Sequence, residues 1–132
     1  MDGIQFQTVL VAGAVDRSGR TLYSYTIPDN LPAFPNPPFH VSHIADTGFY
    51  DVYFVGEVFA KEPGPVVTAT VYGQPIFGDR TDTRDSAIVI DLKRRYARIK
   101  TGNDVGKAED RSFCFTAIGT YEVGISSLAD SC

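Results

Sequence analysis

The sequence predicts an all-β fold, an antiparallel two-sheet β-sandwich of six to eight strands with jelly-roll-like packing. Short runs rich in Val, Ile, Thr, Tyr and Phe alternate with Gly, Pro, Asp and Asn along the whole chain. No segment keeps apolar residues at i, i+3, i+4 and i+7 for three turns without a glycine or proline. With 132 residues, 43% hydrophobic and 12% aromatic, the chain is long enough to form one core without a metal or disulfide framework.

The first two strands are expected at residues 4–15 and 21–27, joined by a hairpin turn at 16–20 in which Gly19 supplies a positive φ. Five prolines then follow within residues 28–38, and they forbid a regular ladder because each removes a hydrogen-bond donor. We therefore divide the chain into an N-terminal β-hairpin (1–27), a Pro-rich linker or crossover (28–38) and a β-sandwich body (39–132). An isolated hairpin is marginally stable, so it should dock on the body or on a neighbouring chain.

The body contains six further strand-like runs, separated by turns at 46–48, 62–64 and 93–95 and by polar loops at 73–85 and 102–110. The runs cover residues 39–45, 49–60, 65–72, 86–92, 96–101 and 111–121. Alternation within them predicts a core that includes Tyr50, Val52, Phe54, Val67, Ala69, Val71, Ile88, Ile90, Phe113, Phe115 and Ala117.

Charge and hydropathy argue against two classes of partner. The net charge is −4 and the pI is near 5.0, so the chain lacks the basic footprint that nucleic acids and anionic lipids attract. No run approaches the roughly 18–20 consecutive apolar residues of a membrane helix, so membrane insertion is not expected. The opening residues 1–4 show neither a basic region nor a signal-peptide cleavage site.

Four groups of residues between Phe39 and Gly119 resemble a known module. They are Thr47–Phe54, Val58-Phe59 with the 65–70 segment, Asn103 with Gly106 and Asp110, and the run Phe113–Gly119. In order and spacing they are similar to the small β-sandwich at the C-termini of phage tail fibres and in bacterial surface proteins. The resemblance implies a homo-oligomer, with a trimer favoured, on a virion or an extracellular surface.

The same layout is similar to H-type lectins. This resemblance implies a six-stranded, oligomeric, sugar-binding domain. A tryptophan commonly helps to form their glycan site, and this chain contains none. The sugar-binding residues of that family therefore do not transfer to this sequence.

The function predicted from these observations is a non-enzymatic binding module that recognises a cell-surface glycan or receptor through its loops, with no cofactor. Asp and Arg side chains of the two polar loops can hydrogen-bond hydroxyl groups, while Tyr72 or Phe77 stacks on a sugar ring. The candidate ligand-binding residues are Tyr72, Phe77, Asp79, Arg80, Asp82, Arg84, Asp85, Asn103 and Asp104. An alternative is a structural trimerisation domain in which the hairpin and the Pro-rich arm wrap a neighbouring chain.

The acidic residues suggest two other kinds of chemistry. The loop aspartates could bind Ca²⁺, but their spacing fits no known calcium loop and the interleaved arginines can neutralise them. The triplet Asp46-Thr47-Gly48 matches the active-site triplet of dimeric aspartic proteases, in which two carboxylates share a proton. Phe49 stands where such proteases need a small residue, and a plain turn explains the same triplet.

The remaining side chains of interest are histidines, cysteines and aromatics. His40 and His43, three apart on a strand, should project to opposite faces and so not chelate one metal. Cys114 and Cys132 could form a bridge, or remain as a buried thiol and a loose terminal one. Exposed aromatics are expected at Tyr23, Tyr25, Tyr53, Tyr72, Phe77 and Tyr96, and a cluster of them would mark an interface.

Overall fold

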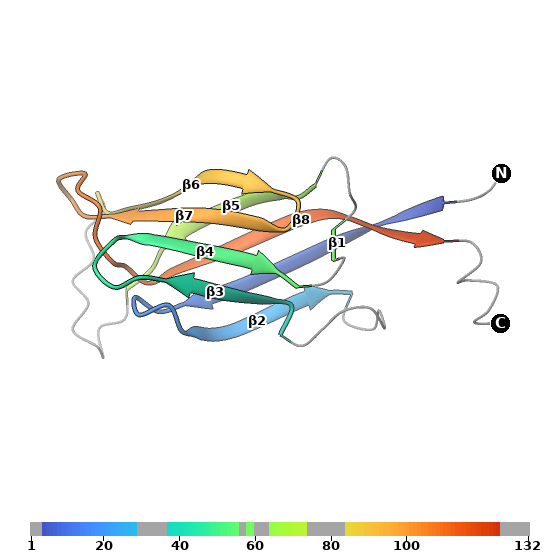
Figure 1. Ribbon diagram of the computed structural model, residues 1–132, viewed down its shortest axis with the longest axis horizontal. Helices are drawn as coiled ribbons and strands as arrows, with labels where there is room; N and C mark the ends of the chain where they lie inside the picture. Colours follow the sequence, from blue (N-terminus) through green and yellow to red (C-terminus); the bar gives the residue numbers. More distant parts are fainter. Residues whose placement is uncertain (1–3, 29–36, 56–57, 60–63, 74–83, 125–132) are drawn as a thin grey trace.

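The computed structural model describes residues 4–28, 37–55, 58–59, 64–73 and 84–124. Eight strands form two four-stranded antiparallel sheets that pack face to face, which confirms the predicted β-sandwich (Figure 1). The strands are β1 (Ile4–Val15), β2 (Thr21–Ile27), β3 (Phe39–His43), β4 (Phe49–Phe54), β5 (Val66–Val71), β6 (Ser86–Lys93), β7 (Tyr96–Gly102) and β8 (Phe113–Gly124).

Sheet A has the strand order β2-β1-β8-β5, and sheet B has the order β3-β4-β7-β6. The pairs β1–β2, β3–β4 and β6–β7 are hairpins within one sheet, and the other connections cross between sheets. The first and last strands are neighbours, as they are in jelly rolls. Every ladder is antiparallel.

Strand β1 is a central strand of sheet A. It pairs with β2 on one side and with β8 along its whole length on the other, from Ile4↔Gly124 to Val15↔Phe113. Its inward side chains Val9, Val11 and Val15 are fully buried in the core. The N-terminal hairpin is thus docked within its own chain.

The core lies between the two sheets and contains most of the residues that alternation predicts. Seven of them are buried, and Ala69 packs partly buried against them; the seven are Tyr50, Val52, Phe54, Val67, Phe113, Phe115 and Ala117. Val71 is half-buried. These positions alternate with polar or exposed residues along their strands, so the hydrophobic pattern indicates which side of each strand faces the core.

The prediction of Ile88 and Ile90 in the core is wrong: they are 51% and 43% exposed. In β6 both alternating sets of side chains are apolar, so the sequence pattern does not indicate which set faces the core. Pairing decides it, because Val89 lies opposite the buried Ile99 and packs with Ala87 against the core. An irregularity in the ladder between Val89 and Asp91 then leaves Ile90 without a partner.

The two ends of the sandwich differ. The turns β1–β2 and β3–β4 and the β7–β8 loop lie at one end, called the tip below, together with the end of β5 and the start of β6 (Figure 1). The start of β1 and the end of β8 lie at the opposite end. There the ribbon of Ile4–Gln7 and Tyr121–Gly124 runs beyond the last paired residues of β2 and β5.

Candidate functional site

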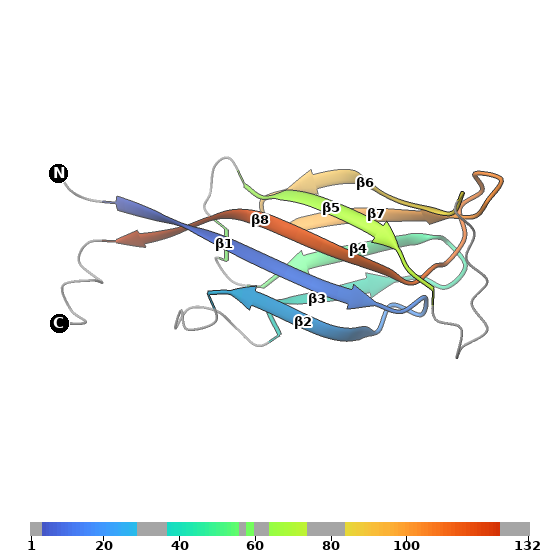
Figure 2. The same ribbon diagram turned by 180° about the vertical axis from the view of Figure 1, so that it is seen from behind.

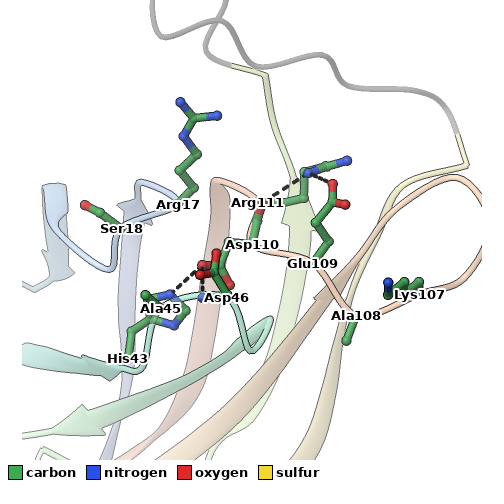
Figure 3. A pocket seen from close by; sticks show the side chains of 10 residues that line it. All are labelled: Arg17, Ser18, His43, Ala45, Asp46, Lys107, Ala108, Glu109, Asp110 and Arg111. Carbon is green, nitrogen blue, oxygen red and sulfur yellow. Dashed lines mark hydrogen bonds and ion pairs between the residues drawn. The ribbon is translucent and has the colours of Figure 1, made fainter.

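An open pocket of about 710 Å³ lies at the tip. Three connections from both sheets supply its walls: the β1–β2 turn, the β3–β4 turn and the β7–β8 loop (Figure 3). Its lining residues are Arg17, Ser18, His43, Ala45, Asp46, Lys107, Ala108, Glu109, Asp110 and Arg111.

The β1–β2 turn is held by the carboxylate of Asp16. It accepts hydrogen bonds from Ser18 N (2.9 Å), Ser18 Oγ (2.6 Å) and Arg20 N (3.0 Å), while Gly19 adopts a φ of 93°. Burial acts to raise the pKa of Asp16, but these hydrogen bonds and the Arg20 charge outweigh it and hold the pKa below its ordinary value. The turn therefore presents Arg17 and Ser18 from a fixed backbone.

Asp110 joins the β7–β8 loop to the β3–β4 turn. Its carboxylate accepts hydrogen bonds from Asp46 N (2.8 Å) and Gly48 N (2.8 Å) and lies 3.0 Å from His43 Nε2, and all three partners are more than sixty positions away in sequence. Hydrogen bonds to an ionised acceptor are stronger than neutral ones. This one carboxylate thus forms the floor of the pocket (Figure 3).

The His43 ring is part of that floor. Its side chain is only 4% exposed and stacks on the Tyr50 ring at a centroid distance of 3.9 Å. Nδ1 donates to the Phe49 carbonyl at 2.7 Å, since a carbonyl only accepts, and Nε2 faces Asp110. Both ring nitrogens are therefore engaged within the protein. As predicted, His40 and His43 lie on opposite faces, with His40 exposed.

Tyr50 also ties the core to the tip. Its ring is fully buried, and its hydroxyl donates to the Arg17 carbonyl at 2.7 Å. Burial and the nearby Asp110 charge raise the pKa of Tyr50 far above its ordinary value, so the phenol stays neutral and keeps donating. The backbone of Arg17 is thereby anchored to β4.

The far wall of the pocket is an ion-pair cluster around Arg111. Its guanidinium contacts Asp85, at 3.3 Å, and Glu109. Burial acts to lower the pKa of Arg111, but the two carboxylates outweigh it and raise the pKa. The Asp85 side chain is 2% exposed, so this contact joins the start of β6 to the β7–β8 loop from inside.

The predicted ligand-binding residues have different fates. Phe77, Asp79, Arg80 and Asp82 lie outside the described residues. Arg84 and Asp104 come together in an exposed ion pair of 3.2 Å, which brings the two predicted loops side by side.

The other three predicted residues lie in structural contacts. Asn103 holds its own loop through bonds from Val105 N and Lys107 N, and Asp85 holds Arg111. Tyr72 is half-buried, with its backbone N–H bonded to the Ser112 carbonyl at 3.1 Å.

None of the ten lining residues is among the predicted ligand-binding residues, and the polar ones that sequence reasoning missed include Arg17, Ser18, Lys107, Glu109 and Asp110. Each lies in a turn or loop whose ends the sequence does identify. The missing signal is spatial, since the pocket forms only when three connections meet at one end.

The Asp46-Thr47-Gly48 triplet forms a tight turn. Asp46 has a φ of 67° and Gly48 a φ of 73°, and Thr47 Oγ1 donates to the Ile44 carbonyl at 2.7 Å. Both flanking backbone N–H groups are capped by Asp110. The geometry accounts for all three residue types as turn formers.

Three further observations concern metals, thiols and membranes. Among the described residues, no group of three His, Cys, Asp or Glu side chains is placed to hold a metal ion. Cys114 is a free, half-buried thiol, and Cys132 lies outside the described residues. The described part of the chain contains no helix long and apolar enough to cross a membrane.

Comparison with protein-family models, with curated proteins and with solved structures finds no match to this chain.

Proposed function

We propose that the domain is a non-enzymatic binding module that recognises a polar ligand, in the first place a cell-surface glycan, at the tip pocket. The observation that carries the proposal is the pocket itself: an open cavity of about 710 Å³ whose walls come from three connections and whose floor is fixed by Asp110. Binding residues are commonly carried by loops on a rigid scaffold.

The charge of the lining favours a polar ligand without a large net charge. Three basic side chains, Arg17, Lys107 and Arg111, face three carboxylates, Asp46, Glu109 and Asp110. Donors and acceptors of both kinds suit the hydroxyl groups of a sugar, each of which donates and accepts. The resemblance to tail-fibre and lectin-like modules supports the same class of ligand.

The test is a glycan array probed with the intact protein, followed by a titration of the best ligand. Lys107→Ala removes an exposed cation from the pocket wall and should weaken binding about tenfold or more, as expected for a charge-assisted hydrogen bond. Lys93→Ala is the matched control, because it removes the same charge from the β6–β7 hairpin at the other end. A blank array, or equal losses in the two variants, would contradict the proposal.

A structural assembly role is the second candidate, and the uncharged side chains on the four-stranded part of the outer face of sheet A favour it. The role of the hairpin and the Pro-rich arm in assembly cannot be tested by deleting residues 1–38. That deletion takes away β1, the central strand of sheet A, with three fully buried core valines. It should unfold the domain whether or not the arm contacts a neighbour, so point substitutions on the outer face are needed.

A further inference from the structure

On the outer face of sheet A, the outward positions carry no charged side chain in the part where all four strands pair, which ends at Leu10 of β1 and Ile118 of β8. Cross-strand register arranges these positions in rows across sheet A, the sheet that faces the viewer in Figure 2. The three complete rows are Tyr23–Ala14–Cys114–Thr70, Tyr25–Ala12–Thr116–Thr68 and Ile27–Leu10–Ile118–Val66. Thr8 and Thr120 continue the pattern along β1 and β8.

Several of these uncharged side chains are large and open to solvent: Tyr25 is 63% exposed and Val66 is 70% exposed. The outer face of sheet B provides the contrast. It carries Asp51 and Arg98 as a bidentate ion pair, with Lys100 over the Phe49 ring. In a chain with 21% charged residues, three uncharged rows across four strands are a feature of interaction surfaces.

The outer face of sheet A has a ridge of large side chains along its β2 edge and a hollow over small side chains in its middle. Strand β2 carries the large side chains Tyr23, Tyr25 and Ile27, whereas β1 and β8 present the small side chains Ala12 and Thr116. A hollow of about 370 Å³ lies over these small residues and over Thr68 and Thr70, beside the two tyrosines. The ridge and the hollow belong to the same face.

We propose that this face packs against the same face of a second copy of the chain, about a two-fold axis parallel to the strands. Such an axis places β2 of one copy over β5 of the other, so each tyrosine ridge enters the partner's hollow. An axis across the strands would instead set tyrosine on tyrosine. Because each copy has a net charge of −4, the three uncharged rows are where two copies can meet without opposing like charges.

The size of the face predicts a weak, reversible dimer. Four strands about 4.8 Å apart and three rows about 6.7 Å apart span roughly 400 Å² in projection. A rough surface and the Thr8–Thr120 row bring the total over both copies to about 1,000 Å², the lower limit for a specific interface. The dimer should therefore dissociate on dilution.

The first test is the mass in solution as a function of concentration, by sedimentation equilibrium. We expect a monomer–dimer equilibrium for the wild type and a monomer for Thr68→Glu, because the new carboxylate would be buried without a partner. Thr68 is exposed, so the monomer should tolerate the change. Ser42→Glu, on the exposed outer face of sheet B, is the matched control and should leave the dimer unchanged.

The orientation is tested by mixing two variants. In the proposed packing Tyr25 of one copy faces Thr68 of the other, because these residues occupy opposite ends of one row. Tyr25→Lys and Thr68→Glu should each be monomeric alone and form a heterodimer together. A wild-type monomer up to about 1 mM, a trimer, or a Thr68→Glu protein that still dimerises would overturn the proposal.

Cys114 gives an independent measurement. It lies on β8 beside the proposed axis, so the two Cys114 Cα atoms should be about 11 Å apart for sheets about 10 Å apart. That distance is too long for a disulfide and suits a short bismaleimide. In the Cys132→Ser background we expect dimers to be cross-linked, and Thr68→Glu should abolish the product. Cross-linking that persists in Thr68→Glu would contradict the packing.

The proposed dimer and the proposed ligand binding at the tip pocket can be tested independently. Lys107→Ala should leave the sedimentation result unchanged, and Thr68→Glu should leave binding of a soluble monovalent ligand unchanged. Loss of both properties in one variant would indicate misfolding, which its thermal unfolding curve would reveal.

Discussion

Asp110→Asn should destabilise the domain far more than an exposed aspartate on the same loop. The Asp110 side chain is 17% exposed and accepts one backbone hydrogen bond at each oxygen, from Asp46 N at Oδ2 and from Gly48 N at Oδ1, while Oδ2 also contacts His43 Nε2. Asparagine offers one carbonyl oxygen, so at best it keeps the bond from Asp46 N. Its amide group then faces the donor Gly48 N, which is buried.

The magnitude follows from what is lost. One hydrogen bond to a charged acceptor is worth about 1.5–3 kcal/mol, and a buried donor left unsatisfied costs about 1–3 kcal/mol. Since the two figures overlap, we expect a loss of about 2–4 kcal/mol in the free energy of unfolding. For a domain of this size that lowers Tm by about 6–15 °C.

The assay is thermal and denaturant unfolding followed by circular dichroism, with Asp104→Asn as the control. Asp104 lies on the same loop, and its ion pair with Arg84 is exposed on both sides, so its loss should cost less than about 1 kcal/mol. If the two variants unfold at the same temperature, Asp110 does not join the loops in the way the geometry indicates. The reasoning about the pocket floor would then fail as well.

Three other substitutions test single contacts by the same unfolding measurements. Asp16→Asn should cost about 1–2 kcal/mol at neutral pH; because the folded pKa of Asp16 is lowered, the difference from wild type should persist above its ordinary value of 3.8 and vanish as the pH falls through the folded pKa. Gly13→Ala should cost about 1–3 kcal/mol, since its Cβ would overlap the buried Phe39 ring; a variant as stable as wild type would contradict the tight packing of the sheets there. Tyr50→Phe should cost about 1 kcal/mol through loss of the hydroxyl bond to the β1–β2 turn, and hydrogen exchange in that turn should speed up selectively.

The strands were predictable because local signals determine them. Alternation gives the buried set of β4, and turn residues such as Gly19 and Gly48, with φ of 93° and 73°, mark where strands end. The ends of strands are harder to predict where apolar residues continue along the sequence past the end of the strand. The 49–60 run ends as a strand at Phe54, and the last strand extends to Gly124 instead of ending near 121.

Sheet order and the pocket depend on pairings that no local pattern encodes. Nothing in residues 4–15 says that β1 lies between β2 and β8, because an edge strand with the same sequence would show the same alternation. The phase of β6 was ambiguous for a related reason, since Ile88 and Val89 are equally apolar and only register with Ile99 separates them. Asp110 likewise looks like any loop aspartate until the fold brings Gly48 to it.

The two proposals place geometric demands on each other. A two-fold axis parallel to the strands keeps the strand direction of both copies along the axis, so both tips of a sheet A dimer point the same way. Two tip pockets would then face one surface, while the start of β1 and the end of β8 in both copies lie on the other side. A shallow, polar pocket binds a single glycan weakly, but two pockets on one rigid body raise the effective concentration at the second site and so the overall affinity for a densely coated surface. A dimer that is itself weak would add this gain only where the protein is concentrated. We therefore expect the protein to be monomeric in dilute solution and to bind strongly to a surface on which it becomes concentrated.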